Sequence, residues 1–416
     1  MNAPVLPKTV TYDVEAVRLD FPALSMEVNG KPLCYLDNGA SAQKPRQVLD
    51  AIRHSYEAEY ANVHRGLHYL ANAATEAFED AREQVRGFLN AGSLDEIVFT
   101  RSATGSLNLV ASSFGRMAGI GPGDEIVISL LEHHSNIVPW HFHRERSGAV
   151  LKWVPVSEEG EFDLAAYERL LTPKTKIVAI THMSNVTGTI TPVKEIIRLA
   201  HERGIPVLLD GSQAAVHMPV DVRDLDVDFY VFTGHKLYGP TGIGVLYAKR
   251  EWLERMPPYE GGGEMIRDVS EDGVTYAGVP SRFEAGTPPL VQAVGLGAAI
   301  RYVNGIGREA ILAHETVLRD YAMERLSRIN ALRIFGTTPD KGAIVAFEMK
   351  DAHAHDVAHV LDRYGIAVRA GTHCAQPLLA RYGVTSTCRA SFGLYNTTAE
   401  IDTLVEALEK TQALFA

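Results

Sequence analysis

The sequence predicts an α/β protein with a mostly parallel seven-stranded sheet covered by helices on both faces, followed by a smaller α+β domain. Short apolar runs alternate with helical patterns up to about residue 250. Several of these runs end in turns rich in glycine or polar residues. The alternation then stops at a stretch rich in glycine and proline, residues 257–289, which predicts turns or an excursion that returns to the site.

The elements follow in order. The first residues read as a polar arm, residues 1–32, with a short helix at 14–20. A short strand near 35–37 and a helix over 45–59 come next, and a second helix covers 73–89. The seven sheet strands are expected at 96–100, 125–128, 150–154, 177–180, 207–209, 229–232 and 243–247.

After the irregular stretch, helices are expected at 290–304 and 309–329. Further strands are expected at 343–349, 366–369 and 388–392, with helices at 355–364 and 399–414. We therefore divide the chain into an arm over 1–32 that packs with the small domain, a large domain over 33–300 and a small domain over 301–416.

Composition excludes several classes of function. The chain has 416 residues, 46% of them hydrophobic, and a net charge of -11 without any stripe dense in lysine or arginine, which argues against nucleic acid as a partner. No apolar run approaches the roughly 18 residues of a membrane span, and the N-terminus lacks the apolar core of a signal peptide. Three scattered cysteines are too few for a disulfide framework. We expect a reducing, cytoplasmic setting.

Two strand ends carry a specific chemistry. Lys236 lies in the glycine-rich turn 233–242 after one strand, and Asp210 ends another strand. A lysine can hold an aldehyde, and a carboxylate can keep a pyridine nitrogen protonated, so the pair matches what pyridoxal phosphate needs. Either residue alone could be a solvated turn residue or a helix cap.

Other polar residues follow neighbouring strands. Small hydroxylated residues at 101–106 open a helix and could seat a phosphate, although an ordinary N-cap explains them too. His133 could stack on an aromatic cofactor or be a satisfied buried histidine. The loop 62–68 is either surface or a wall of the pocket.

A set of motifs distributed over most of the chain resembles the pyridoxal-phosphate-dependent cysteine desulfurases of the SUF type. These motifs are YLDNGA, NVHRGLH, EHHSNIVPWH, THMSNVTG, DGSQA, DVDFYVFTGHKLYGPTGIG, MPPYEGGGEMI, RFEAGTP, AGTHCAQP and CRASFGLYNT. The resemblance implies the fold of type I pyridoxal phosphate enzymes, with the cofactor in the large domain and a nucleophilic cysteine loop in the small one. It also implies a homodimer with sites at the interface.

The resemblance further implies roles for single residues. Lys236 would hold the cofactor and move the substrate α-proton, and His133 would stack on the ring. Asp210 would pair with the ring nitrogen and Gln213 with the ring hydroxyl. The phosphate ligands would be Thr104, Thr233 and His235, with Thr287 contributed to the neighbouring subunit's site.

On the substrate side, the resemblance implies that Arg389 and Asn185 bind the carboxylate, since a guanidinium fork matches two carboxylate oxygens. Cys374, in a polar turn with glycine, would be the nucleophile that takes sulfur from L-cysteine as a persulfide and leaves L-alanine. His133 or Cys374 could protonate the leaving group. We expect Cys34 and Cys388 to be small buried hydrophobic residues, which is the usual role of a free cysteine.

Sulfur would pass to an acceptor protein of the SufU or SufE type for iron–sulfur cluster assembly. We expect no resident metal, but His355 matches a histidine that becomes a zinc ligand when a SufU-type acceptor docks; a solvated histidine at a helix start is the alternative. Gly39, Ser212 and Thr372 depart from the family pattern, which leaves selenocysteine lyase as an alternative activity. A catalytically inactive scaffold is the other alternative.

Overall fold

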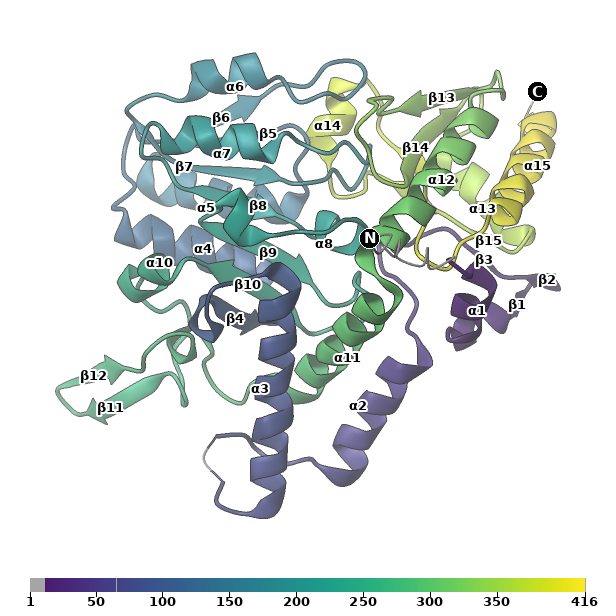
Figure 1. Cartoon of the computed structure of the whole chain (residues 1–416). Coiled ribbons are helices and arrows are strands. Elements are labelled where there is room, and N and C mark those ends of the chain that lie inside the picture. Colours follow the sequence, from purple (N-terminus) through teal and green to yellow (C-terminus); the bar gives the residue numbers. More distant parts are fainter. Residues whose placement is uncertain (1–11, 65, 416) are drawn as a thin grey trace, which may run out of the picture.

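The computed structural model describes residues 12–64 and 66–415, so the predicted arm over 1–32 is described only from Tyr12 onward. The chain forms a large lobe around one sheet and a smaller C-terminal lobe beside it (Figure 1). The sheet has seven strands in the order β4-β10-β9-β8-β7-β5-β6. Strand β10 is antiparallel to both of its neighbours and the remaining pairs are parallel, which confirms the predicted fold class.

The sheet strands match the predicted apolar runs. Their bounds are β4 (Ile97–Thr100), β5 (Glu125–Ser129), β6 (Val150–Val154), β7 (Thr175–Thr181), β8 (Val207–Asp210), β9 (Phe229–Thr233) and β10 (Gly244–Ala248). Every residue of β9 is buried, as expected for a strand covered on both faces.

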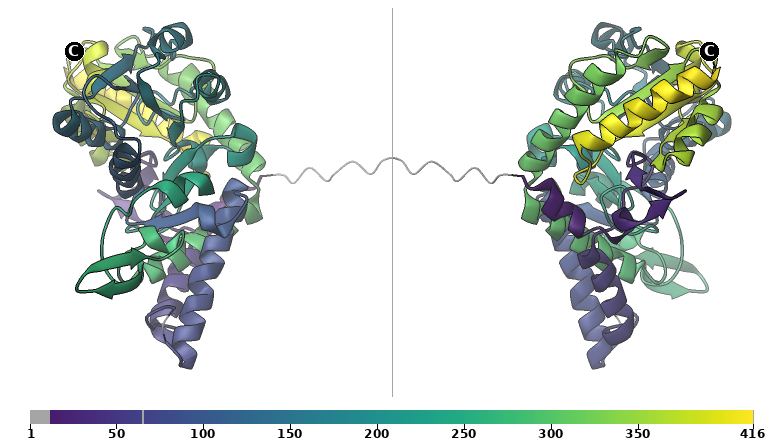
Figure 2. Two further views of the ribbon diagram at one scale, coloured as in Figure 1. Left: turned by 90° about the vertical axis from the view of Figure 1, so that its left-hand side faces the viewer. Right: turned by 90° about the vertical axis from the view of Figure 1, so that its right-hand side faces the viewer.

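Helices cover both faces because alternate strand residues point to opposite sides. One apolar cluster joins the sheet to α4 (Ala103–Met117), α5 (Val138–Ser147) and α10 (Arg250–Arg255). On the other face lie α3 (Tyr69–Leu89), α6 (Leu164–Leu170), α7 (Val193–His201) and α11 (Leu290–Ile306). The helices α2 (Arg46–Ala58) and α3 project together away from the body (Figure 2).

The smaller lobe contains an antiparallel sheet in the order β13-β14-β17-β16. These strands are β13 (Leu332–Phe335), β14 (Ile344–Met349), β16 (Arg369–Gly371) and β17 (Thr387–Ser391). They pack against α12 (Arg308–Leu326), α13 (Ala354–Arg363) and α15 (Thr398–Phe415). The sequence did not predict β13, whose four residues are too few to display a clear period.

An early segment of the chain belongs spatially with this smaller lobe. Strand β3 (Cys34–Tyr35) pairs in parallel with β15 (Ile366–Ala367), and Leu36 lies in the apolar cluster of the smaller lobe. The segment is preceded by α1 (Val14–Leu19) and the two-residue strands β1 (Glu27–Val28) and β2 (Lys31–Pro32). The predicted boundary at residue 33 stays a prediction, but the pairing brings residues 34–37 beside the C-terminal strands.

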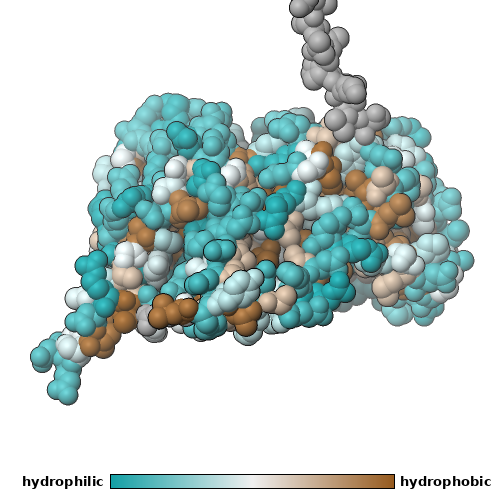
Figure 3. Space-filling model, turned by 60° about the horizontal axis from the view of Figure 1, so that its bottom comes forward, coloured by the Kyte–Doolittle hydropathy of each residue, from teal (hydrophilic) through white to brown (hydrophobic). Residues whose placement is uncertain are grey.

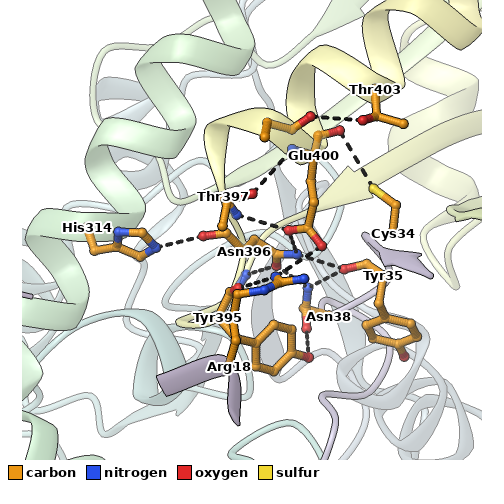
Figure 4. Close-up of polar contacts among 12 residues, drawn as sticks. Arg18, Cys34, Tyr35, Asn38, His314, Tyr395, Asn396, Thr397, Glu400 and Thr403 are labelled. Carbon is orange, nitrogen blue, oxygen red and sulfur yellow. Dashed lines mark hydrogen bonds and ion pairs between the residues drawn. The ribbon is translucent and has the colours of Figure 1, made fainter. Parts of the chain in front are cut away.

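A buried polar network fastens this early segment to the smaller lobe (Figure 4). The Arg18 guanidinium donates to the Tyr395 carbonyl at 2.6 Å and lies 3.1 Å from the Glu400 carboxylate. The Asn38 amide donates to Asn396 Oδ1 at 3.0 Å. Since Asn38 precedes Gly39, the network holds the turn 37–41 in place.

The irregular stretch 257–289 contains a β-hairpin that the sequence did not reveal. Strands β11 (Ile266–Ser270) and β12 (Gly273–Tyr276) project from the large lobe, and every residue but Ile266 is exposed (Figure 1). The smaller helices α8 (Ala214–His217), α9 (Val222–Leu225) and α14 (Gln376–Arg381) complete the chain. In the described part, no helix is long and apolar enough to cross a membrane.

Candidate active site

The predicted site residues converge on one cavity of about 600 Å³ between the two lobes. The large lobe contributes residues from the ends of β7, β8 and β9 and from the start of α4, and the smaller lobe contributes β16, β17 and the loop between β16 and α14. The predicted residues that line it are Thr104, His133, Asn185, Asp210, Gln213, Thr233, His235, Lys236, His355, Cys374 and Arg389. Thus the lysine and the exposed thiol of one chain face a common space.

Lys236 lies in the turn after β9, beside Asp210 at the end of β8. The pKa of Lys236 is lowered from 10.5 to about 8, mainly because the amine is buried; Asp210 opposes this shift and the positive charge of Arg389 contributes to it. A larger fraction of this amine is therefore neutral at physiological pH than for an exposed lysine. The neutral amine is the form that attacks a carbonyl.

Asp210 and Gln213 are fixed by local contacts. Asp210 Oδ1 accepts hydrogen bonds from the Ser212 backbone N–H at 3.0 Å and from the Ser212 hydroxyl at 2.6 Å. The Gln213 amide nitrogen donates to the Gly39 carbonyl at 2.8 Å. Within the described chain, Gln213 Oε1 is buried and has no hydrogen-bond partner. A buried acceptor without a partner at a cavity wall is suited to receive a hydroxyl from a bound molecule.

His133 precedes a short 3₁₀ turn, residues His134–Asn136, and its ring Nδ1 accepts from the Ser135 backbone N–H at 3.1 Å. This bond assigns the ring proton to Nε2. Burial lowers the pKa of His133 to about 3, and the positive charge of Lys236 adds to the effect. The ring is therefore neutral and can present an N–H from Nε2.

The turn that carries His133 rests on a fully buried carboxylate. Glu132 Oε1 accepts from the Ser129 hydroxyl at 2.5 Å and from the Thr181 N–H at 2.9 Å, and Oε2 accepts from the Asn136 amide at 2.7 Å. Burial raises the pKa of Glu132 to about 8. Glu132 thereby joins the ends of β5 and β7 to the turn. The sequence motif contained Glu132, but its spacing gave no sign of this role.

Hydroxyl and imidazole groups gather at the start of α4. The Thr104 hydroxyl lies 2.7 Å from the Ser135 hydroxyl, and the Ser102 side chain caps the helix by accepting from the Gly105 N–H at 3.1 Å. Thr233 and His235 line the same cavity, and burial lowers the pKa of His235 to about 4. Free N–H groups at the start of a long helix favour an anion.

Arg389 lies on β17 and is 3% exposed. Its guanidinium donates to the Asn185 carbonyl at 2.8 Å and to Asp37 Oδ1 at 3.2 Å, whereas its buried Nε has no partner within the described chain. Arg369 lies 3.3 Å from the other oxygen of Asp37. Two guanidinium groups against one carboxylate leave a net positive charge for a second carboxylate.

Asp37 and Arg369 were not predicted from the sequence as residues of the site. Asp37 comes just after the two-residue strand β3, and Arg369 opens the three-residue strand β16. Their position beside a short strand was the signal that the sequence offered. Their contact depends on the pairing of β3 with the C-terminal strands, which no local pattern encodes.

Cys374 is exposed and lies in a loop with two consecutive left-handed residues, His373 (φ 51°) and Cys374 (φ 54°). Each such residue costs roughly 1–2 kcal/mol. The loop is held by the large lobe, because the Asn185 amide donates to the His373 carbonyl at 2.8 Å and the His134 N–H donates to the Cys374 carbonyl at 2.6 Å. Cys34 and Cys388 are buried.

Two predicted regions lie away from this cavity. Thr287 lines a separate cavity of about 310 Å³ that also contains Arg101 and Glu260. His64, from the loop 62–68, lines a third cavity of about 290 Å³, and Arg65 lies outside the described residues. Their predicted contribution to a neighbouring subunit stays a prediction. In the described part of the chain, no three histidine, cysteine or acidic side chains are grouped to hold a metal ion.

The chain was compared with known families and proteins. Residues 34–404 match the family model of aminotransferase class-V. The chain is 53% identical over 409 residues to a probable cysteine desulfurase of Streptomyces coelicolor, covering 97% of this chain and 98% of that protein. It is 51% identical over 415 residues to a cysteine desulfurase of Dickeya dadantii, covering 100% of this chain and 99% of that protein.

The solved structures agree with these similarities. The crystal structure of the cysteine desulfurase CsdA from Escherichia coli superposes with a TM-score of 0.91 and is 41% identical in sequence. The match covers 98% of this chain and 100% of that one. The fold and the length of the relatives are therefore shared from end to end.

Proposed function

Because this chain belongs to the class-V aminotransferase family, we propose that it is a cysteine desulfurase that converts L-cysteine to L-alanine and retains the sulfur as a persulfide on Cys374. The observation that supports this best is the common cavity of Lys236, Arg389 and the exposed Cys374. An amine, a carboxylate clamp and a free thiol are the groups that this reaction needs. The names of the relatives favour cysteine over the selenocysteine alternative.

The cofactor of this family is pyridoxal phosphate, and the residues present fit it. Lys236, with its lowered pKa, is suited to hold the aldehyde, and Asp210 is suited to face the ring nitrogen. The unpartnered Gln213 Oε1 offers an acceptor for the ring hydroxyl. Thr104, Thr233 and His235 would hold the phosphate at the start of α4, and His133 would lie against the ring. When bound, the cofactor accepts the electrons released at the substrate α-carbon.

The residues of this chain would perform the remaining work. Arg389 binds the substrate carboxylate through its free Nε edge, with Asn185 beside it. The Lys236 amine would remove the α-proton and later return a proton to the product. His133 is neutral, so it acts as a hydrogen-bond donor from Nε2, which leaves Cys374 itself as the better source of the proton for the leaving group.

Cys374 takes the sulfur atom. Its sulfur bonds to the substrate sulfur while the carbon–sulfur bond of L-cysteine breaks, so that L-cysteine and the enzyme thiol become L-alanine and an enzyme persulfide. The thiol of Cys374 is exposed at the mouth of the cavity, where it can reach both a bound substrate and an external acceptor. Cys34 and Cys388 are buried at 3% and 1% exposure and are unsuited to this role.

The test measures alanine and persulfide together. The purified holoenzyme is mixed with L-cysteine, alanine is quantified, and the Cys374 peptide is examined by mass spectrometry for an added sulfur atom. Cys374→Ser should abolish alanine formation and leave the absorption of the bound cofactor in place, whereas Cys388→Ser should keep both alanine formation and the cofactor absorption. Alanine formation by Cys374→Ser at the wild-type rate would reject the assignment.

We further propose that the sulfur passes to a SufU- or SufE-type acceptor for iron–sulfur cluster assembly of the SUF type, in the cytoplasm. His355 is exposed and lines the cavity together with Cys374, which supports a role at the docking face. His355→Ala should reduce transfer to a zinc-bearing acceptor and spare turnover with a small thiol. Equal loss of both activities would reject this role.

A homodimer is proposed as the working unit. Support comes from large apolar side chains at the projecting end of α2 and α3, among them Leu67 at 100%, Tyr69 at 79% and Tyr56 at 56% exposure. Figure 3 brings this underside forward, where apolar patches lie beside the projecting hairpin. A partner covering this end could bring Thr287 to its neighbour's phosphate site. Sedimentation of the wild-type protein and of Leu67→Glu tests the proposed homodimer. A monomeric wild-type protein would reject it.

A further inference from the structure

The loop that carries Cys374 has a conformation that requires external support. Two neighbouring residues, His373 and Cys374, both have positive φ angles although neither is glycine. Such a pair persists only where surrounding contacts hold it. The loop is also exposed at Cys374, so packing alone does not confine it.

One residue of the large lobe makes two contacts with the chain at and just after Cys374. The backbone N–H of His134 donates to the Cys374 carbonyl at 2.6 Å. The ring Nε2 of the same histidine accepts a hydrogen bond from the Gln376 backbone N–H at 3.2 Å. His134 therefore holds the chain at two positions that are two residues apart, at Cys374 through its backbone and at Gln376 through its side chain.

The turn that carries His134 is held rigidly by hydrogen bonds. His134 opens the 3₁₀ turn that the buried Glu132 fixes through Asn136. Its neighbour His133 faces the cavity, whereas the His134 ring reaches the smaller lobe. The two adjacent histidines thus serve opposite sides, one toward the cavity and one toward the thiol loop.

From these contacts we propose that His134 is a positioning residue that keeps the Cys374 loop docked over the cavity. The proposal rests on the proposed function, because sulfur capture needs the thiol near the substrate and sulfur delivery needs it outside. The backbone bond survives any side chain at position 134. The ring bond does not, so the His134 side chain sets how much of the time the loop is docked.

The test measures access to Cys374 without any turnover. Holoenzyme without substrate is treated with iodoacetamide, and alkylation of the Cys374 peptide is followed by mass spectrometry. His134→Ala should speed alkylation about 3- to 10-fold, the effect of losing one hydrogen bond. His134→Gln should stay within about twofold of wild type, because its amide oxygen can accept from the Gln376 N–H.

The control is His141→Ala, which removes a half-buried histidine of α5 outside the cavity and should leave the alkylation rate unchanged. The cofactor absorption of His134→Ala should match that of wild type, since His133 keeps its place. Alkylation of His134→Ala at the wild-type rate, or a changed cofactor spectrum, would overturn the proposal. Alkylation of Cys374 in His134→Gln at the rate found for His134→Ala would also overturn the proposal.

A second arm uses L-cysteine. In a single turnover, persulfide formation on Cys374 should slow in His134→Ala by a factor similar to the gain in alkylation, and His134→Gln should restore it. If wild type forms no persulfide, the proposed function fails, but the alkylation arm still decides whether His134 docks the loop. If wild type forms the persulfide and His134→Ala forms it at the same rate, the docking role is rejected while the proposed function stands.

Discussion

The two sides of the cavity are built differently. On the cofactor side, Lys236 and Asp210 stand at the ends of buried parallel strands, and their positions follow from the sheet. On the thiol side, Cys374 lies in an exposed loop with left-handed residues, and hydrogen bonds from Asn185 and His134 hold it across the lobe boundary. The first side is fixed by the fold, and the second by a few separable contacts. Under the proposed function, a group that stays with the cofactor needs no freedom to move, whereas a thiol that delivers sulfur does.

The strongest way to test this division is to remove the lysine. Lys236→Ala should lose the covalent attachment of pyridoxal phosphate and roughly 10³-fold or more of the alanine-forming rate, since it removes the base for the α-proton. The absorption of the bound cofactor and alanine production measure both effects. Alkylation of Cys374 should stay at the wild-type rate, because the loop contacts do not involve Lys236. A large change in that rate would show that the two sides are not separable.

Arg389 stands between the two sides, since its guanidinium donates to the carbonyl of Asn185. Arg389→Lys should raise KM for L-cysteine roughly 10- to 100-fold, because an ammonium group lacks the planar fork that matches a carboxylate. Steady-state kinetics measure the effect, with Arg333→Lys at an exposed position of strand β13 as the matched control. An unchanged KM would place the carboxylate elsewhere.

The lowered pKa of Lys236 gives a pH dependence on the cofactor side. Below about pH 8 the amine of the apoprotein is mostly protonated, so the rate of capturing pyridoxal phosphate should rise nearly tenfold per pH unit and level off above about pH 8. Stopped-flow absorbance measures this rate. A rise that continues to pH 10 would indicate an unshifted lysine.

The smallest effect is expected for Glu132, which supports the turn that carries His133 and His134. Glu132→Gln keeps an acceptor for the Ser129 hydroxyl and the Thr181 N–H, so the free energy of unfolding should fall by only about 1 kcal/mol. Glu132→Ala leaves three buried donors without partners and should cost about 3 kcal/mol or more. Denaturant unfolding measures both. Equal losses would mean that the hydrogen bonds of Glu132 do not stabilise the turn.

The same contrast explains what the sequence could predict. The seven sheet strands were predictable because apolar runs such as Phe229–Thr233 are buried on both faces and stand out locally. Residues at their ends, such as Asp210, followed from the rule that ligands bind at the carboxyl ends of parallel strands. These parts of the fold and of the site needed no knowledge of distant contacts.

The parts that were not predicted depend on distant pairing. Strand β3 has two residues and lies beside β15, more than 300 residues later in the chain, so Asp37 meets Arg389 and Arg369 only in the folded protein. The exposed hairpin β11–β12 lacks a buried face and therefore lacks an alternating apolar pattern. The hydrogen bonds between His134 and the segment around Cys374 likewise join parts of the chain that are distant in sequence, so the sequence did not predict them.

Asn185 takes part in both halves of this arrangement. Its backbone carbonyl receives the Arg389 guanidinium, and its side-chain amide reaches the His373 carbonyl. One residue therefore contacts both Arg389, the proposed ligand of the substrate carboxylate, and the loop that carries Cys374. Under the proposed function, a shift of Asn185 on substrate binding would also displace the loop of Cys374, so that occupancy of the cavity and exposure of the thiol would be linked through one residue.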